Sequence, residues 1–181
     1  GWSFNVPTAE FYNSFEEGDS RRDATVLDIE AFAAATGSSY TEGYDHTGYF
    51  NNKYIPRAGE SGGQTELNYL TNFRIIRYSD VLLMAAEAYN RGGIDDGLAQ
   101  EFLNQVRRRA FGDDDNDISA SGTALTDAIW EERKFELSLE GHRFFDLVRT
   151  GRASSLIPGF VEGKHEVFPI PQQEIDISGL T

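Results

Sequence analysis

Residues 131–152 read EERKFELSLEGHRFFDLVRTGR, a stretch in which acidic and basic side chains alternate with apolar ones. Glu132, Glu136 and Glu140 are spaced four residues apart, so on a helix they share one face. Apolar Ile129 and Leu139 lie on or beside that face, which places the carboxylates toward the interior. Carboxylates on a core-facing side need cationic partners. The spacing therefore predicts a buried ion-pair network, for which we expect these members: Arg107, Glu132, Arg133, Glu136, Glu140, Arg143, Asp146 and Arg149.

The same residue types also occur in catalytic sites, and a glycoside hydrolase using Glu132 and Glu136 is the alternative. Such an enzyme needs two carboxyl groups about 5–10 Å apart across an open cleft. Helical spacing can meet the distance, but neighbouring arginines would keep both groups ionised and remove the general acid. His142 has no Asp, Ser or metal partner in the sequence pattern that would make it a catalytic base. The structural network is the preferred interpretation, and we expect Glu136 and Arg143 to be largely buried and ion-paired.

Upstream, residues 79–90 (SDVLLMAAEAYN) are apolar nearly all round, which predicts a buried helix stopped by Gly92 and Gly93. Residues 98–110 (LAQEFLNQVRRRA) carry one apolar stripe and predict a second helix. A helix, a short turn and a helix over about 34 residues is typical of a tetratricopeptide unit. The sequence thus predicts a mainly α fold built from tetratricopeptide-like helical pairs.

A second pair is expected downstream. The third helix runs from about Ala124 to Glu140, with Thr123 or Thr126 as its N-cap. Gly141 interrupts it, and HRFFDLVRTG (residues 142–151) forms a short fourth helix. The prolines of FPIP (residues 168–171) then predict that residues 161–178 form an extended strap lying over the bundle.

The first third of the chain differs in composition. A short helix is expected after Pro7 and a strand at Thr25–Ile29. Residues 36–66 are rich in Gly, Ser, Asn and Tyr and predict a long loop, with a short hairpin around Gly48–Ile55. We therefore divide the chain into a loop-rich segment, 1–71, which carries the candidate ligand loops, and a helical region, 72–181.

Small-molecule binding sites combine aromatic side chains with polar side chains that hydrogen-bond the ligand. The loop and the chain start supply these types, and the candidate ligand-binding residues are Trp2, Tyr40, Tyr44, Asp45, His46, Asn51, Asn52 and Arg57. Tyr49 and Tyr54 are instead expected to be framework residues beneath the loop.

Composition limits the other function classes. A formal net charge of −14 argues against a nucleic-acid partner, because phosphate binding needs a basic face. The chain has no cysteine, and its three histidines are far apart in sequence, so we expect no metal site and no cofactor. The acidic loop from Asp113 to Asp117 suggests a calcium-binding site, because calcium prefers oxygen ligands. The loop lacks the glycine and glutamate of a standard calcium loop, so a solvated acidic loop is the preferred interpretation.

Four pieces of sequence carry a family pattern in order: NFRIIRYSDVLLMAAEA (72–88), LNQVRRRA (103–110), IWEERKFELSLEGHRFFDLVRTG (129–151) and VFPIPQQEI (167–175). Weaker signatures precede them in PTAEFY, DSRR, TGYF and KY. Together these resemble the C-terminal part of the SusD/RagB family. Ser20 departs from the pattern, since the family often has proline there.

The resemblance implies a non-catalytic oligosaccharide-binding lipoprotein on the outer face of the outer membrane, anchored through an N-terminal cysteine that this sequence lacks. It implies a SusC-like TonB-dependent transporter and the remaining N-terminal part of the same protein as partners. We therefore expect no enzymatic activity and regard the chain as a C-terminal segment. The alternative from another class is a tetratricopeptide-type scaffold that binds protein and no sugar.

Overall fold

The computed structural model describes residues 6–55 and 72–179. The chain divides into two compact units, Gly1–Gly141 and His142–Thr181. In the first unit the described residues form, in chain order, α1 (Ala9–Asn13), α2 (Arg21–Thr25), β1 (Val26–Asp28), α3 (Ile29–Thr36), β2 (Tyr49–Asn51), α4 (Tyr78–Arg91), α5 (Asp96–Phe111) and α6 (Gly122–Glu136). In the second unit they form α7 (Arg143–Arg149), α8 (Ala153–Leu156) and α9 (Gln172–Ser178).

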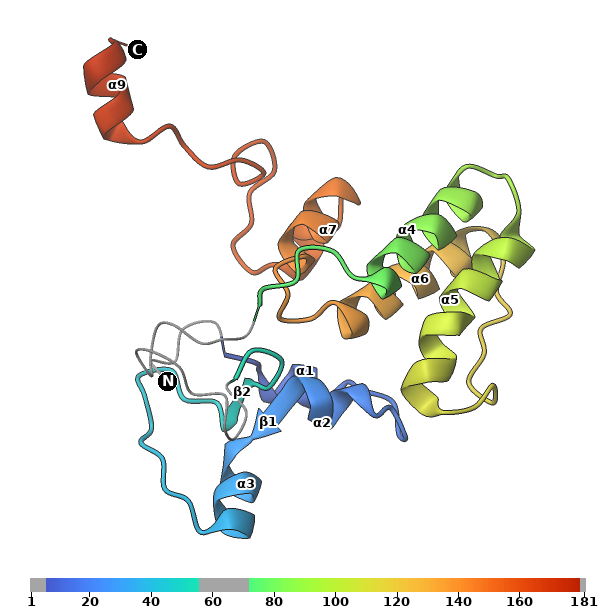
Figure 1. The fold of residues 1–181 in the computed structure, drawn as a ribbon. Helices are drawn as coiled ribbons and strands as arrows, with labels where there is room; N and C mark the ends of the chain where they lie inside the picture. Colours follow the sequence, from blue (N-terminus) through green and yellow to red (C-terminus); the bar gives the residue numbers. More distant parts are fainter. Residues whose placement is uncertain (1–5, 56–71, 180–181) are drawn as a thin grey trace. The chain divides into compact units, whose positions relative to one another are not determined.

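Helices α4, α5 and α6 pack on one another and enclose the main hydrophobic core (Figure 1). Ala86 of α4 and Ala99 of α5 are fully buried, and their small side chains let the two helices approach closely. The core is filled by Leu82, Leu83, Leu103, Val106, Leu125 and Ile129. This arrangement confirms the predicted mainly α fold with tetratricopeptide-like helical pairs.

Helix α5 begins and ends at the residues that its sequence favours. The Asp95 side chain accepts a hydrogen bond from the Leu98 amide at 3.0 Å and caps the N-terminus. Gly112 ends the helix with φ of 91°, a left-handed conformation that glycine adopts without a steric cost.

The N-terminal segment packs on α6 through a second, aromatic core. Phe15 and Val26 meet Phe135 of α6, with Phe11 and Tyr12 packed against them. The Phe15 and Phe135 ring centroids are 4.8 Å apart. These contacts join residues more than a hundred positions apart in sequence and hold the N-terminal segment against the helical core.

Strand β1 pairs antiparallel with β2, with Leu27 opposite Phe50. The strand predicted at Thr25–Ile29 is therefore confirmed, but the local hairpin predicted around Gly48–Ile55 is wrong. That segment supplies one strand only, and its partner comes from far upstream. The short helix expected after Pro7 is confirmed as α1, which Thr8 caps by accepting from the Phe11 amide at 3.1 Å.

The third predicted helix exists as α6, but it is shorter than expected and begins at a different residue. Its N-cap is Ser121 rather than Thr123 or Thr126. It ends at Glu136, after which Leu139 has φ of 62° and Gly141 has φ of 89°. Two left-handed residues so close together cannot continue a right-handed helix, so Glu140 lies in the turn that follows.

In the second unit the predicted fourth helix is confirmed as α7. The extended strap predicted through residue 178 is wrong at its end, because residues 172–178 form α9. Pro171 immediately precedes this helix with φ of −55°, a position where a missing N–H costs nothing. Within the part of the chain that the structure describes, no helix is both long and apolar enough to cross a bilayer.

Candidate functional site

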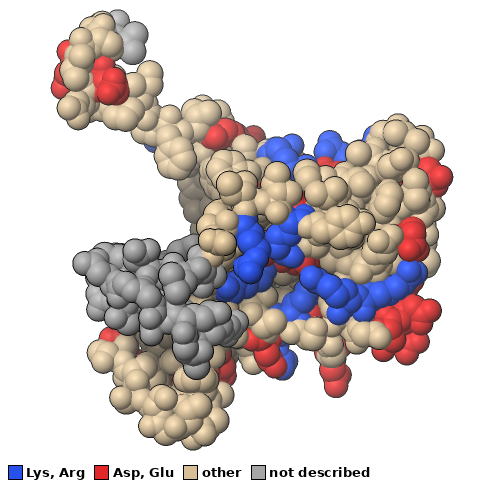
Figure 2. All heavy atoms as spheres, in the orientation of Figure 1, with Lys and Arg blue, Asp and Glu red and all other residues tan. Residues whose placement is uncertain are grey.

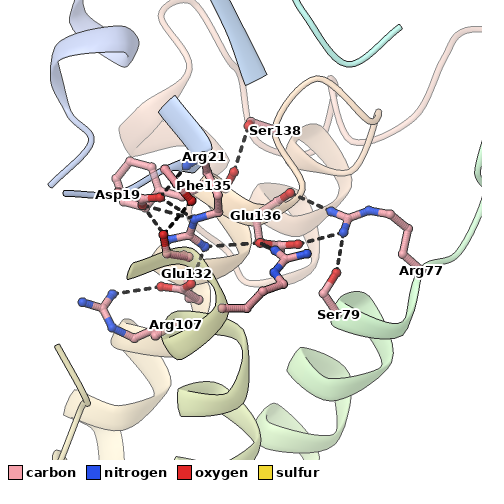
Figure 3. Close-up of polar contacts among 12 residues, drawn as sticks. Asp19, Arg21, Arg77, Ser79, Arg107, Glu132, Phe135, Glu136 and Ser138 are labelled. Carbon is pink, nitrogen blue, oxygen red and sulfur yellow. Dashed lines mark hydrogen bonds and ion pairs between the residues drawn. The ribbon is translucent and has the colours of Figure 1, made fainter. Parts of the chain in front are cut away.

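The charged face of α6 lies at the centre of the first unit, where Arg21 from α2 reaches two of its carboxylates (Figure 3). The Arg21 guanidinium donates to Asp19 from Nε and Nη2, at 2.8 Å and 2.6 Å, and from Nη1 to Glu132 and to Glu136. Arg107 of α5 donates from Nη1 to the other oxygen of Glu132 at 2.9 Å. Each oxygen of Glu132 therefore accepts from a different guanidinium, although burial still raises the pKa of this carboxyl.

Glu136 accepts from three arginines. Arg77 Nη1 is 2.7 Å from one carboxylate oxygen, and Arg109 Nη2 is 2.5 Å from the other, which Arg21 also approaches at 3.3 Å. Burial alone would raise the pKa of Glu136, but the charges of Arg109 and Arg77 outweigh it and lower the pKa to about 2. The side chain is only 1% exposed, so this carboxylate is ionised and buried.

Glu140 holds the two ends of one chain segment together. Lys53 Nζ donates to it at 2.6 Å, and Arg77 donates to it from Nε and Nη2, both at 2.7 Å. Burial opposes ionisation of Glu140, but the hydrogen bonds from Arg77 and Lys53 prevail and lower its pKa. Lys53 precedes residues 54–76 and Arg77 follows them, so the Glu140 carboxylate joins the two ends of that segment.

Arg133, Asp146 and Arg149 of the expected network also form ion pairs. Arg133 pairs with Asp80 of α4 at 2.8 Å, and both side chains are buried. Asp146 pairs with Arg149 within α7, three residues along the same helix. Arg143 was expected to be largely buried but is only partly so, because it begins α7 after the Gly141 turn rather than continuing α6.

Five cluster members were missed by the sequence interpretation: Asp19, Arg21, Lys53, Arg77 and Arg109. All but Arg109 lie at least fifty residues from Glu136 in sequence, so no helical spacing connects them to it. The only available signal was the run Asp19–Arg22, which holds an acidic and a basic residue two positions apart.

A cavity of about 440 Å³ opens beside the cluster. Its lining residues come from five separate parts of the first unit: Ser20, Arg21, Ala24, Thr25, Lys53, Tyr54, Arg74, Arg77, Arg109, Ala110, Glu136 and Glu140. A second cavity, of about 410 Å³, is lined by Arg77, Tyr78, Ser79, Leu82, Gln105, Val106 and Arg109. Glu132 lines neither cavity, so only Glu136 and Glu140 of the three carboxylates on this side border open space.

The candidate sugar-binding residues of the 36–66 loop lie in different environments. Tyr44 is 96% exposed and Asp45 is also exposed. Tyr40 packs on His46 with ring centroids 5.4 Å apart, and His46 lies 5.8 Å from the Phe50 ring. Both ring nitrogens of His46 are buried without a hydrogen-bond partner among the described residues. Tyr40, His46 and Phe50 thus form a small aromatic group near exposed Tyr44 in sequence.

The asparagines of this loop make structural contacts. The Asn51 side chain accepts from the Lys53 amide at 2.8 Å, and the Asn52 side chain donates to the Asp23 carbonyl at 2.8 Å. Trp2 and Arg57, the remaining candidates, lie outside the described residues.

The two tyrosines expected to be framework residues make aromatic contacts. Tyr49 stacks on Tyr12 with centroids 4.5 Å apart, and Tyr54 stacks on Phe73 at 5.4 Å. The Tyr54–Phe73 contact is a second link between the two ends of the 54–76 segment, in addition to the contacts with Glu140.

No described group of three or more His, Asp or Glu side chains could hold a metal ion. In the acidic loop, Asp117 pairs with Arg108 and the Asp113 side chain accepts from the Asp115 amide at 3.2 Å. Two of the loop's acidic side chains therefore have partners within the protein.

Comparison with known proteins gives consistent matches. The sequence profile of the SusD family matches residues 1–157. SusD-like protein P2 of Formosa agariphila is 29% identical over 97% of this chain and 38% of its own length. A laminarin binding SusD-like protein of known structure has a TM-score of 0.80 and 43% identity, covering 97% of this chain and 37% of that one. Surface glycan-binding protein A from Bacteroides thetaiotaomicron, in complex with laminarihexaose, has a TM-score of 0.83 and 35% identity, covering 98% of this chain and 40% of that one.

The chain therefore spans about two fifths of the length of the proteins that it matches.

Proposed function

Because the chain belongs to the SusD family, we propose that it is part of a protein that binds oligosaccharides without cleaving them. The observation that carries the proposal is its similarity, over nearly its whole length, to a glycan-binding protein whose structure holds laminarihexaose. A chain this similar in sequence and fold is expected to keep the same kind of ligand, although fold alone would not assign one.

The ligand class we propose is a laminarin-type glucan. Both solved structures named above are described by their binding of laminarin or laminarihexaose, and their identities to this chain are 43% and 35%. The aromatic loop supplies suitable chemistry, because exposed Tyr44 offers a flat apolar face to a sugar ring and Asp45 offers hydrogen-bond acceptors. Trp2, Tyr40, His46, Asn51, Asn52 and Arg57 remain proposed members of this site.

The charges of the α6 cluster support a function without catalysis. A glycoside hydrolase needs one protonated carboxyl group to donate to the leaving oxygen. Glu136 and Glu140, which border the cavity, both have lowered pKa values and are therefore ionised at neutral pH. Glu132 has a raised pKa but is 1% exposed and lines neither cavity. A sugar at the cavity would meet carboxylates and no acid.

We further propose that the whole protein acts at the outer face of the outer membrane, where it delivers glycan to a SusC-like TonB-dependent transporter. Family membership is the support for this location and partner.

Calorimetry of the chain with laminarihexaose, together with an assay for newly released reducing ends, tests the proposal. We expect saturable binding, no cleavage, and about tenfold weaker binding by Tyr44→Ala, because removing an aromatic side chain that contacts the ligand typically costs more than about 1 kcal/mol. Phe168→Ala removes another highly exposed aromatic ring, outside the loop, and this variant should bind normally. Cleavage that Glu136→Gln abolishes would instead establish a hydrolase. Capture of the transporter with no glycan binding would establish a protein-interaction scaffold.

A further inference from the structure

The cavity of about 440 Å³ beside α6 concentrates positive charge in an acidic protein. Its lining includes five cationic side chains, Arg21, Lys53, Arg74, Arg77 and Arg109, and two carboxylates. The whole chain carries a formal net charge of −14. Figure 2 shows Lys and Arg side chains near the middle of the face in view and extending toward its right side. Cavity walls of low dielectric focus the field of such a cluster, so the space attracts anions.

The inner cations of this cavity are already neutralised. Arg21 and Arg77 divide their guanidinium groups among Asp19, Glu132, Glu136 and Glu140, and Lys53 is bound to Glu140. These groups hold the two cavity carboxylates in place, and Arg109 of the outer arginines also donates to Glu136.

Two arginines at the cavity keep donors for a ligand. Arg74 is exposed and has no ion pair among the described residues. Arg109 donates to Glu136 from Nη2 only, and its side chain remains 57% exposed. A guanidinium offers five N–H donors in a planar fork that suits carboxylate and sulfate oxygens. Most of the donors of these two side chains therefore have no partner in the described part of the chain.

The second cavity, of about 410 Å³, adjoins the first at Arg77 and Arg109, which line both. It adds a different kind of surface. Tyr78 is 73% exposed and presents an aromatic ring, and Gln105 presents an amide. Leu82 and Val106 form an apolar floor. An aromatic ring, an amide and an apolar floor next to arginines are the groups that bind a sugar bearing a negative charge.

We propose that the two adjoining cavities form a binding site for an acidic sugar, whose carboxylate or sulfate group is held by Arg74 and Arg109 and whose ring lies on Tyr78. Lys53 and Tyr54 of the 36–66 loop line the first cavity, but the site uses none of the residues proposed to bind neutral glucan. It gives the chain a second ligand class and does not depend on the first proposal.

Titration calorimetry at constant ionic strength tests this site, with glucuronic acid as the probe, glucose as the neutral control and inorganic sulfate as the free-anion control. We expect saturable binding of glucuronic acid, weaker binding of sulfate and none of glucose. Arg74→Gln and Arg109→Gln should each weaken glucuronic acid binding by about tenfold or more, as expected for the loss of hydrogen bonds to a charged group. Arg22→Gln, an exposed arginine outside both cavities, should bind as the unmodified chain does.

Tyr78→Ala distinguishes the contribution of the sugar ring to binding from that of the charged group. It should weaken glucuronic acid binding and leave sulfate binding unchanged. Circular dichroism of each variant shows whether it is folded, and Arg74 is suited to this test because no described ion pair depends on it.

The proposal is overturned if glucuronic acid shows no saturable binding, if glucose binds as well, or if Arg22→Gln weakens binding as much as the cavity variants do. Sulfate binding as tight as glucuronic acid binding would also overturn it, because the site would then recognise a free anion rather than an acidic sugar.

Discussion

Replacing Glu136 by glutamine tests whether the charge network stabilises the fold. Glutamine keeps the size of the side chain and removes its charge. Folding lowers the pKa of Glu136 from 4.5 to about 2, which corresponds to roughly 3 kcal/mol of stabilisation at neutral pH. This agrees with the cost of about 3–5 kcal/mol usually found when one partner of a buried ion pair is removed. We expect Glu136→Gln to lower the free energy of unfolding by roughly 3 kcal/mol at pH 7.

The pH dependence distinguishes lost charge from disturbed packing. Because folding lowers the pKa of Glu136, its stabilising effect is complete above about pH 4.5 and is lost as the pH falls toward 2. The difference in stability between the unmodified chain and Glu136→Gln should therefore shrink to roughly 1 kcal/mol at pH 3. A packing defect would cost the same at both pH values.

Urea denaturation followed by circular dichroism at pH 7 and pH 3 measures both quantities. Glu131→Gln is the matched control, because Glu131 lies on the same helix, is 45% exposed and pairs only with Lys134 among the described residues. Its loss should cost below about 1 kcal/mol, as is usual for surface pairs. A cost of less than about 1 kcal/mol for Glu136→Gln at pH 7, or a cost that does not fall at pH 3, would refute the ion-pair argument.

Three further predictions concern the hydrophobic core, the two chain ends that Glu140 joins and the turn after α6. Leu83→Ala should lower the free energy of unfolding by roughly 3 kcal/mol, because this side chain is fully buried, whereas Met84→Ala, at a 44% exposed position, should cost below about 1 kcal/mol in the same urea titration. Glu140→Gln should speed backbone hydrogen exchange at residues 53–55 and 72–77, measured by mass spectrometry, because Lys53 and Arg77 lose their shared carboxylate. Unchanged exchange at these residues would show that Glu140 does not stabilise them. Gly141→Ala should destabilise the chain by about 1–2 kcal/mol because φ is 89° at this residue, and a variant as stable as the unmodified chain would contradict this.

The helical core was predictable because its signals are local. Residues 79–90 and 98–110 carry apolar patterns that need no knowledge of the rest of the chain, and the structure places α4 and α5 there. The i, i+4 spacing of Glu132 and Glu136 likewise predicted that both carboxylates share the inner face of one helix. Their burial followed from the apolar residues beside them.

The rest depended on contacts that sequence spacing does not show. Strand β2 pairs with β1 rather than with a neighbouring strand, so the predicted hairpin was wrong. Helix α3 was not predicted, although Asp28 caps its N-terminus and Gly37 ends it, and both are recognisable signals. The partners Arg21 and Arg77 come from segments that only the folded chain brings to α6.

The cavities show why the candidate sites were harder to predict than the fold. Arg74 and Arg109 lie on separate elements, and nothing in the sequence distinguishes them from other surface arginines until both line one space. The exposed ring of Tyr44, by contrast, lies in a loop whose composition already suggested ligand contact.

The pairing of Arg21 with Glu132 has a consequence for biosynthesis. The two residues are 111 positions apart, so Arg21 leaves the ribosome long before its partner is made. Helices α4 and α5 are neighbours in sequence and can associate while α6 is still being synthesised, because contacts between nearby residues form fastest. The N-terminal segment can dock onto α6 only after α6 has been synthesised. Until docking occurs, Asp19 is the one described ion-pair partner of Arg21 that has been made, and the aromatic side chains of Phe11 and Phe15 stay exposed, which favours misfolding and capture by chaperones.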